Sequence, residues 1–174
     1  MFKAILPVVA GVILLSACGG NSSDTHEHNH DHSGTGDHSG AGDHSGKPAA
    51  VSNTIELSGG DDMKFNQTNF TVEANKPVKL TLTHSGKMDK NVMGHNFVLL
   101  KPLTDVMSFA SEAVNAKDNN YIPAGTDKVV ASTKLLGGGE SETIEFTLTE
   151  KGTYPFLCSF PGHAGIMRGV ILVE

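Results

Sequence analysis

Short runs of alternating polar and apolar residues, separated by turn-forming residues, are the feature of this 174-residue chain that most restricts its fold. An alternating run buries one face of a β-strand and leaves the other polar, and many such runs at short spacing favour a β-sandwich. Glycine pairs, Asn-Lys-Pro and Gly-Gly-Gly lie between the runs, as turns require. The expected strands span residues 54–57, 70–73, 78–83, 97–101, 128–131, 143–148, 154–158 and 170–173. We therefore predict an all-β fold.

One segment departs from the strand pattern. Between Leu103 and Ala116, apolar residues recur at the spacing of a single helical face, which is typical of a helix packed on a core. The residues on that face are Val106, Phe109, Ala110, Ala113 and Val114. We predict one short helical insertion in the sandwich.

The start of the chain resembles a bacterial lipoprotein signal. Residues 1–17 contain one lysine and an apolar stretch too short to cross a bilayer, and they end in Leu-Ser-Ala before Cys18. In a lipobox of this kind the signal is cut before the cysteine, and that cysteine carries lipid. The expected location is the bacterial cell envelope. Gly19, in place of the aspartate of an inner-membrane retention signal, favours the outer membrane, with the domain in the periplasm or exposed at the surface.

Residues 18–50 contain almost no apolar side chains and carry Gly-Asp-His-Ser-Gly twice. Such a composition cannot bury enough surface to fold, so we expect a disordered tether ahead of a domain over residues 51–174. Histidines interleaved with acidic residues can also bind copper, zinc or nickel weakly, although a soluble spacer explains the composition equally well. The tether histidines are His26, His28, His30, His32, His38 and His44.

Residues 158–167, Cys-Ser-Phe-Pro-Gly-His-Ala-Gly-Ile-Met, place a thiol, an imidazole and a thioether on one segment. A thiolate and an imidazole suit copper or zinc, whereas a thioether is a poor zinc ligand and is the usual weak axial partner of blue copper. Blue copper needs a second imidazole, which His95 can supply. The spacing alone can arise by chance, because a lone buried cysteine is often a core residue. The Pro161–Gly162 turn and the strand that follows favour a rigid ligand loop.

These motifs resemble the azurin family of the cupredoxin superfamily over roughly residues 53–174. The resemblance rests on Asn-Val-Met-Gly-His-Asn at residues 91–96, Thr-Lys-Leu-Leu-Gly at residues 133–137, and the ligand loop at residues 158–167. It implies a Greek-key sandwich with one helical flap and one type 1 copper ion, alternating between Cu(I) and Cu(II). The implied ligands are His95, Cys158, His163, Met167 and the backbone carbonyl oxygen of Gly94.

The resemblance also implies roles for residues around the ligands. Backbone N–H groups of Asn96 and Phe160 would donate to the Cys158 sulfur, and the Asn96 side chain would join the two ligand segments through Ser159. His84 matches a position near the copper that does not bind it. No role beyond proton-coupled tuning is assigned to it.

An apolar docking patch is implied around the edge of His163, through which electrons would leave. Its residues are Met93, Pro161 and Gly162, and simple core packing is the alternative for Met93. The resemblance fails at Asn53 and Asn75, where azurins carry the two cysteines of a disulfide.

The implied function is single-electron transfer by a membrane-tethered, monomeric domain. Its expected partners are c-type cytochromes and periplasmic or membrane reductases or peroxidases. The alternative is a metal-handling lipoprotein that stores, buffers or delivers copper. We expect no enzyme, because nothing in the sequence supplies an oxyanion hole or an orienting acid beside Cys158 and His163. A net charge of −6 without a basic patch excludes nucleic acid as a partner.

Overall fold

The computed structural model describes residues 50–174. The predicted signal at residues 1–17, the predicted lipid attachment at Cys18 and the six histidines of the predicted tether lie outside the described residues. Within residues 50–174, no helix is both long enough and apolar enough to cross a membrane.

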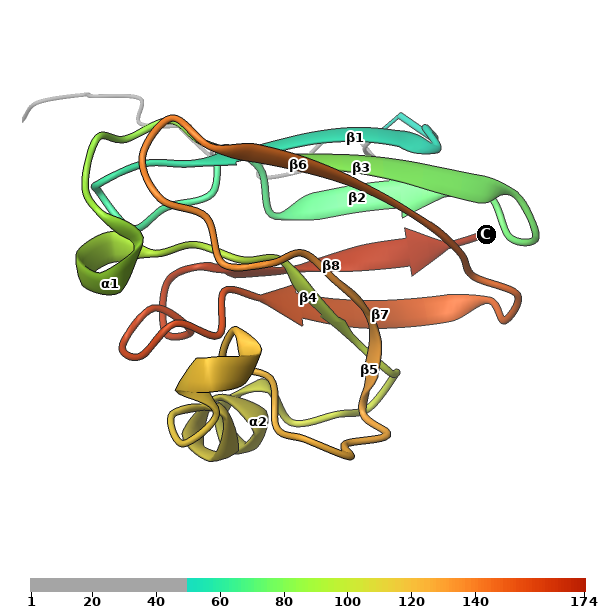
Figure 1. Cartoon of the computed structure of the whole chain (residues 1–174). Helices are drawn as coiled ribbons and strands as arrows, with labels where there is room; N and C mark the ends of the chain where they lie inside the picture. Colours follow the sequence, from blue (N-terminus) through green and yellow to red (C-terminus); the bar gives the residue numbers. More distant parts are fainter. Residues whose placement is uncertain (1–49) are drawn as a thin grey trace, which may run out of the picture. The chain divides into compact units, whose positions relative to one another are not determined.

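Eight strands in the described part of the chain form two sheets (Figure 1). The three-stranded sheet has the order β1 (Thr54–Gly59), β3 (Pro77–His84), β6 (Ser141–Thr147). The five-stranded sheet has the order β2 (Asn69–Val72), β8 (Arg168–Val173), β7 (Gly152–Leu157), β4 (Val98–Leu100), β5 (Val129–Ser132). Each predicted run overlaps one of these strands, so the prediction of an all-β sandwich is confirmed.

The strand order does not follow the sequence, and both sheets are mixed. β1 runs parallel to β3, and β2 runs parallel to β8, while the other pairs are antiparallel. The ligand loop connects β7 to β8, and these two strands are neighbours in the sheet. β8 also pairs with β2 on its other side. The sheet therefore fixes both ends of that loop.

The core lies between the two sheets and is rich in phenylalanine. Along β3 every second side chain is buried, as expected for a strand with one face on a core. Phe156 on β7 is at the centre, with ring centroids 5.3 Å from Phe97, 5.7 Å from Phe65 and 5.9 Å from Phe70. These tilted contacts are typical of favourable aromatic packing. They form a rigid base under the loops at one end of the sandwich.

The predicted helix is confirmed as α2 (Val106–Ala113), which buries Phe109 and Ala113 and is capped by Asp105. The structure adds two single turns, α1 (Lys90–Met93) and the 3₁₀ helix η1 (Lys117–Asn119), that the residue pattern did not reveal. Neither turn buries a side chain, so neither carries an apolar repeat that periodicity can detect. Both lie near the metal-ligand candidates in sequence or space.

Asn53 occupies one of the two positions at which azurins, the family that this chain resembles, carry the cysteines of a disulfide. Its side-chain oxygen accepts from the Glu73 backbone N–H at 3.0 Å, and its amide donates to the Glu73 carbonyl at 3.3 Å. Two hydrogen bonds thus join the segment before β1 to the end of β2.

Candidate metal centre

Three buried donors meet at one end of the sandwich. The ligand atoms of His95, Cys158 and His163 all lie within 4.8 Å of one another, and this is the one such group among residues 50–174. The Cys158 sulfur is 4.0 Å from Nδ1 of His95 and 3.5 Å from Nδ1 of His163. Three donors around one ion, each about 2.0 to 2.3 Å from it, are separated by about 3.5 to 4 Å. The group therefore fits a single metal ion.

The ligand loop is closed by hydrogen bonds between its own residues. The Cys158 N–H donates to the Met167 carbonyl at 2.9 Å, and the Met167 N–H donates to the His163 carbonyl at 2.8 Å. The His163 N–H donates to the Phe160 carbonyl at 3.1 Å. These bonds hold three of the predicted ligands in one compact turn.

His95 is held by a different part of the chain. Its backbone exchanges two hydrogen bonds with Leu136, at 3.0 and 2.8 Å. Its Nε2 lies 2.8 Å from the carbonyl oxygen of Gly60. Because a carbonyl can only accept, Nε2 carries the proton and Nδ1 keeps a free lone pair toward the Cys158 sulfur. The contact sets the tautomer that a metal ligand needs.

Met167 and Gly94 border the same site. Met167 is fully buried, and a Cβ on Gly59 would lie 2.8 Å from its Cε and 3.2 Å from Cδ2 of His95. Gly59 therefore leaves the space that both side chains occupy. The Gly94 carbonyl oxygen is 3.8 Å from the Cys158 sulfur, which places it beside the three donors.

Asn96 connects the two segments that carry the donors. Its side-chain oxygen accepts from the Ser159 N–H at 2.8 Å, and its amide donates to the Ser159 hydroxyl at 2.8 Å. The same amide donates to the Asn120 carbonyl at 2.8 Å. Asn96 and Ser159 are both buried, so these bonds are little weakened by water.

Burial shifts the protonation of the donors. Loss of solvation raises the pKa of the Cys158 thiol to about 11, although backbone N–H groups of Asn96 and Phe160 bond to the sulfur and act in the opposite direction. Loss of solvation lowers the pKa of His163 to about 4, helped by the neighbouring His95 and His84. It also lowers the pKa of His95. Both imidazoles are therefore neutral ligands near pH 7, and metal binding must displace the thiol proton.

His84 stacks on His95 and is not among the hydrogen-bond partners found for the Cys158 sulfur. The two rings stack at 4.3 Å with an angle of 14° between their planes. Nε2 of His84 donates to the Met93 carbonyl at 2.7 Å, and Nδ1 accepts from the Gly86 N–H at 3.1 Å. With both nitrogens bonded and the ring fully buried, His84 packs His95 in place.

The residues of the predicted docking patch lie at the outer side of this site. Met93 and Pro161 are half-buried and Gly162 is exposed. Nδ1 of His163 faces the sulfur, and Nε2 bonds to no described residue. His163 as a whole is buried, with only 3% of its surface exposed, so little of the ring reaches solvent.

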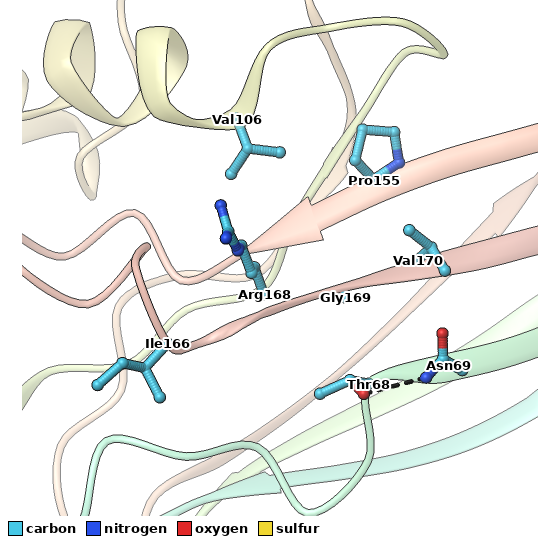
Figure 2. Close-up of a pocket in the computed structure, with 8 residues that line it drawn as sticks. All are labelled: Thr68, Asn69, Val106, Pro155, Ile166, Arg168, Gly169 and Val170. Carbon is cyan, nitrogen blue, oxygen red and sulfur yellow. Dashed lines mark hydrogen bonds between the residues drawn. The ribbon is translucent and has the colours of Figure 1, made fainter. Parts of the chain in front are cut away.

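Two grooves flank the ligand loop without contributing ligands. One of about 250 Å³ lies between the loop and α2 and is lined mainly by apolar side chains, among them Met107, Ala110 and Val114. The other, of about 470 Å³, lies beside Ile166 at the start of β8 (Figure 2). The Arg168 side chain there points toward Val106 on α2, away from Thr68 and Asn69 (Figure 2).

Several contributing residues escaped the sequence analysis. Gly59 and Gly60 were assigned only to a turn, although one makes room for Met167 and the other accepts from His95. Leu136, which bonds to the His95 backbone, was identified only as part of the azurin-like motif at residues 133–137. A glycine pair at the end of a predicted strand signals close backbone approach, but only the fold shows what approaches.

The donor set indicates which ion suits the site. One thiol, two neutral imidazoles and a buried thioether match the ligands of blue copper, whereas zinc sites rarely use a thioether. His95, Cys158 and His163 would hold copper directly, with Met167 next to them. The fit agrees with the prediction of copper as the cofactor.

Comparison with known proteins gives consistent results. A family model described as copper binding proteins, plastocyanin/azurin family, matches residues 51–174. An azurin of Bordetella pertussis is 38% identical over 127 residues, covering 70% of this chain and 84% of that protein. An azurin of Pseudomonas chlororaphis is 38% identical over 125 residues, covering 69% of this chain and 97% of that protein.

Solved structures agree with the sequence comparison. The dithionite-reduced auracyanin of Roseiflexus castenholzii aligns with a TM-score of 0.64 at 36% identity, covering 71% of this chain and 98% of that one. The prediction of a cupredoxin-like fold is thereby confirmed, and so is copper as the cofactor. On these grounds, and with its buried cysteine and two histidines around one ion site, the chain belongs to the plastocyanin/azurin family of copper-binding proteins.

Proposed function

We propose that this chain carries single electrons through one type 1 copper ion held by His95, Cys158, His163 and Met167. The observation that carries the proposal is the buried convergence of the three donors within 4.8 Å. Copper would supply the one-electron couple between Cu(I) and Cu(II). The protein would supply ligands fixed by hydrogen bonds from the surrounding fold, so that a change of oxidation state requires little movement of the chain.

The decisive experiment is optical and kinetic. Copper-loaded protein should show an intense visible band when oxidised, and Cys158→Ser should lose that band because the thiolate is gone. Reduced protein mixed with an oxidised c-type cytochrome in a stopped-flow instrument should exchange electrons rapidly. A colourless oxidised protein, or an unchanged band in Cys158→Ser, would contradict the proposal.

The proposed exit for the electron is the His163 edge. The orientation of His163, whose Nδ1 faces the sulfur, and the partly exposed patch of Met93, Pro161 and Gly162 support this route, because an apolar surface beside a ligand ring favours close docking. Met93→Lys should slow electron exchange with the cytochrome while leaving the visible band in place. Exchange at the wild-type rate would show that the partner docks elsewhere.

We further propose that lipid on Cys18 anchors the protein in the bacterial outer membrane and that residues 18–50 tether the domain to it. The support is the lipobox-like Leu-Ser-Ala-Cys sequence and the polar composition of residues 19–50. The partners would then be periplasmic c-type cytochromes and terminal reductases or peroxidases. Labelling with a fatty acid should mark the wild-type protein and spare Cys18→Ser, which should be recovered in the soluble envelope fraction.

A second function is favoured by the six histidines between residues 26 and 44. Interleaved imidazoles and carboxylates can collect copper near the site, which would suit a storage or delivery protein. Such a protein should lose its copper readily to a competing chelator, whereas an electron carrier should retain it. Calorimetric titration of the isolated segment with Cu(II) should give heat only if the segment binds the ion.

A further inference from the structure

We propose that Asn120 is a positioning residue for the metal centre, because it connects both ligand segments to one fixed corner of the chain. Asn120 follows η1 and lies in the connection between α2 and β5. Its hydrogen bonds in the described residues do not include the side chains of the four predicted ligands. Its role follows from what its backbone oxygen and its side chain each bind.

The backbone oxygen of Asn120 bonds to the buried side chain of Asn96. It accepts from the Asn96 amide at 2.8 Å. That amide also donates to the Ser159 hydroxyl at 2.8 Å, and the Asn96 side-chain oxygen accepts from the Ser159 N–H. Asn120 thereby orients the Asn96 side chain, which links the segment of His95 to the segment of Cys158.

The side chain of Asn120 acts on the other side. Its oxygen accepts from the Leu135 N–H at 3.0 Å. Leu135 packs against Gly94 so closely that a Cβ on Gly94 would lie 2.8 Å from Leu135 Cγ. The next residue, Leu136, holds the His95 backbone through two hydrogen bonds. The Asn120 side chain therefore fixes the segment against which Gly94 and His95 rest.

The backbone conformation explains why asparagine stands here. Asn120 has φ 53° and ψ 32°, and Tyr121 follows with φ 59°. Asparagine is among the few non-glycine residues that adopt this left-handed region readily. Two successive residues in it persist only where neighbouring contacts hold them.

The ring of Tyr121 supplies such a contact. It packs edge-on against Phe160 at 5.3 Å, and the Phe160 backbone N–H bonds to the Cys158 sulfur. The corner formed by Asn120 and Tyr121 thus reaches the metal centre at Asn96, Leu135 and Phe160. Together these contacts fix both ligand segments from outside the ligand set.

Asn120→Gly tests whether the Asn120 side chain positions the metal ligands, without disturbing the backbone of the turn. Glycine keeps the left-handed conformation and the backbone oxygen, and it removes only the acceptor for Leu135. We expect about a tenfold loss of copper affinity, the lower end of what outer-shell contacts contribute. We also expect a shifted midpoint potential and, in the metal-free protein, faster hydrogen exchange at the Leu135 N–H. The affinity and exchange measurements do not depend on the proposed electron-transfer function.

Two variants complete the test. Asn120→Asp keeps a side-chain oxygen at the same place and should restore copper affinity to nearly the wild-type value. Asn119→Gly is the matched control, because Asn119 is exposed on the same turn and its amide donates only to the Ile122 carbonyl, at 2.8 Å. It should leave affinity, potential and Leu135 exchange unchanged. Equal effects of Asn120→Gly and Asn119→Gly, or none from Asn120→Gly, would overturn the proposal.

Discussion

The two segments that supply the metal ligands are held in place in different ways. The loop at residues 158–167 is closed by hydrogen bonds between its own residues. The segment around His95 depends on partners far away in the sequence: Gly60, 35 residues before it, binds its ring, and Ser159, 63 residues after Asn96, binds the neighbouring side chain. The loop is a local structure, whereas the geometry of His95 is a property of the whole fold.

This difference predicts where the site is vulnerable. Changes in the loop that spare its ligands and Ser159 should have local and small effects, because the loop's own hydrogen bonds hold its shape. Changes around His95 should disturb several elements together. Substitutions in the two segments and changes of pH test this asymmetry.

The largest expected effect is from Gly94→Ala. A Cβ there would lie 2.4 Å from the Lys90 carbonyl oxygen and under 3 Å from the Leu135 side chain, and a backbone oxygen cannot move aside cheaply. We expect a loss of about 3 kcal/mol or more of unfolding free energy, at the upper end of overpacking effects. Urea unfolding of the metal-free protein measures it.

Gly165→Ala is the control for that prediction within the ligand loop. A Cβ on Gly165 meets nothing within 4 Å, and the residue does not have a positive φ. Its unfolding free energy should stay within about 0.5 kcal/mol of the wild-type value. Similar losses from both alanine variants would contradict the asymmetry between the segments.

Asn96→Leu tests the link between the two segments. The substitution leaves the buried Ser159 N–H without its acceptor and the partly buried Asn120 carbonyl without its donor. We expect a loss of about 2 to 3 kcal/mol of unfolding free energy. We also expect a higher reduction potential, because the segments that orient the ligands are no longer joined. Voltammetry with an unchanged potential would show that Asn96 only stabilises the fold.

How far the sequence predicts the structure follows from the same asymmetry. The loop was predicted with its three ligands, because cysteine, histidine and methionine lie within ten residues of one another and Pro161 and Gly162 indicate a turn between the cysteine and the histidine. The eight strands were also predicted, because alternating burial leaves a period in the sequence. Local structure leaves local signals.

The rest of the site was not predictable from local signals. Gly60, Leu136 and Asn120 support the ligands through backbone atoms or one exposed side chain, and their residue types carry no metal-binding chemistry. His95 itself was identified by its resemblance to a known motif and by the need for a second imidazole. Its partners became visible only when the fold brought β1, β4 and the segment before β6 together.

The pH dependence of metal binding offers a third test, and it concerns the loop. Since burial raises the pKa of Cys158 to about 11, the free thiol is protonated throughout the neutral range, and each metal ion bound must release one proton. Apparent affinity should therefore rise about tenfold per pH unit between roughly pH 5 and 10. Competition titrations at several pH values measure the slope.

His163 and Cys158 give the metal-free fold opposite dependences on pH. The pKa of His163 falls from 6.5 to about 4 on folding, so its neutral form contributes stability above pH 6.5 that is lost as the pH falls toward 4. The pKa of Cys158 rises from 9.0 to about 11, so its contribution is present below pH 9 and is lost as the pH rises toward 11. A metal-free protein with flat stability from pH 4 to 7 would contradict the burial of His163.

The smallest expected effect concerns Thr133, which supports the His95 segment one step further out. Its hydroxyl oxygen accepts from the Phe97 N–H at 2.9 Å, and its own N–H donates to the Phe97 carbonyl at 3.0 Å. Thr133→Val keeps the shape and the second bond but leaves the buried Phe97 N–H unpaired, which should cost about 1 kcal/mol. Thr133→Ser removes the methyl group but retains the hydroxyl acceptor, so it is the control that keeps the Phe97 bond. Because Phe97 follows Asn96 directly, Thr133→Val should also weaken copper binding slightly, whereas Thr133→Ser should not. A larger effect on copper affinity than that of Asn96→Leu would mean that the strand, and not the side-chain link to Ser159, sets the position of His95.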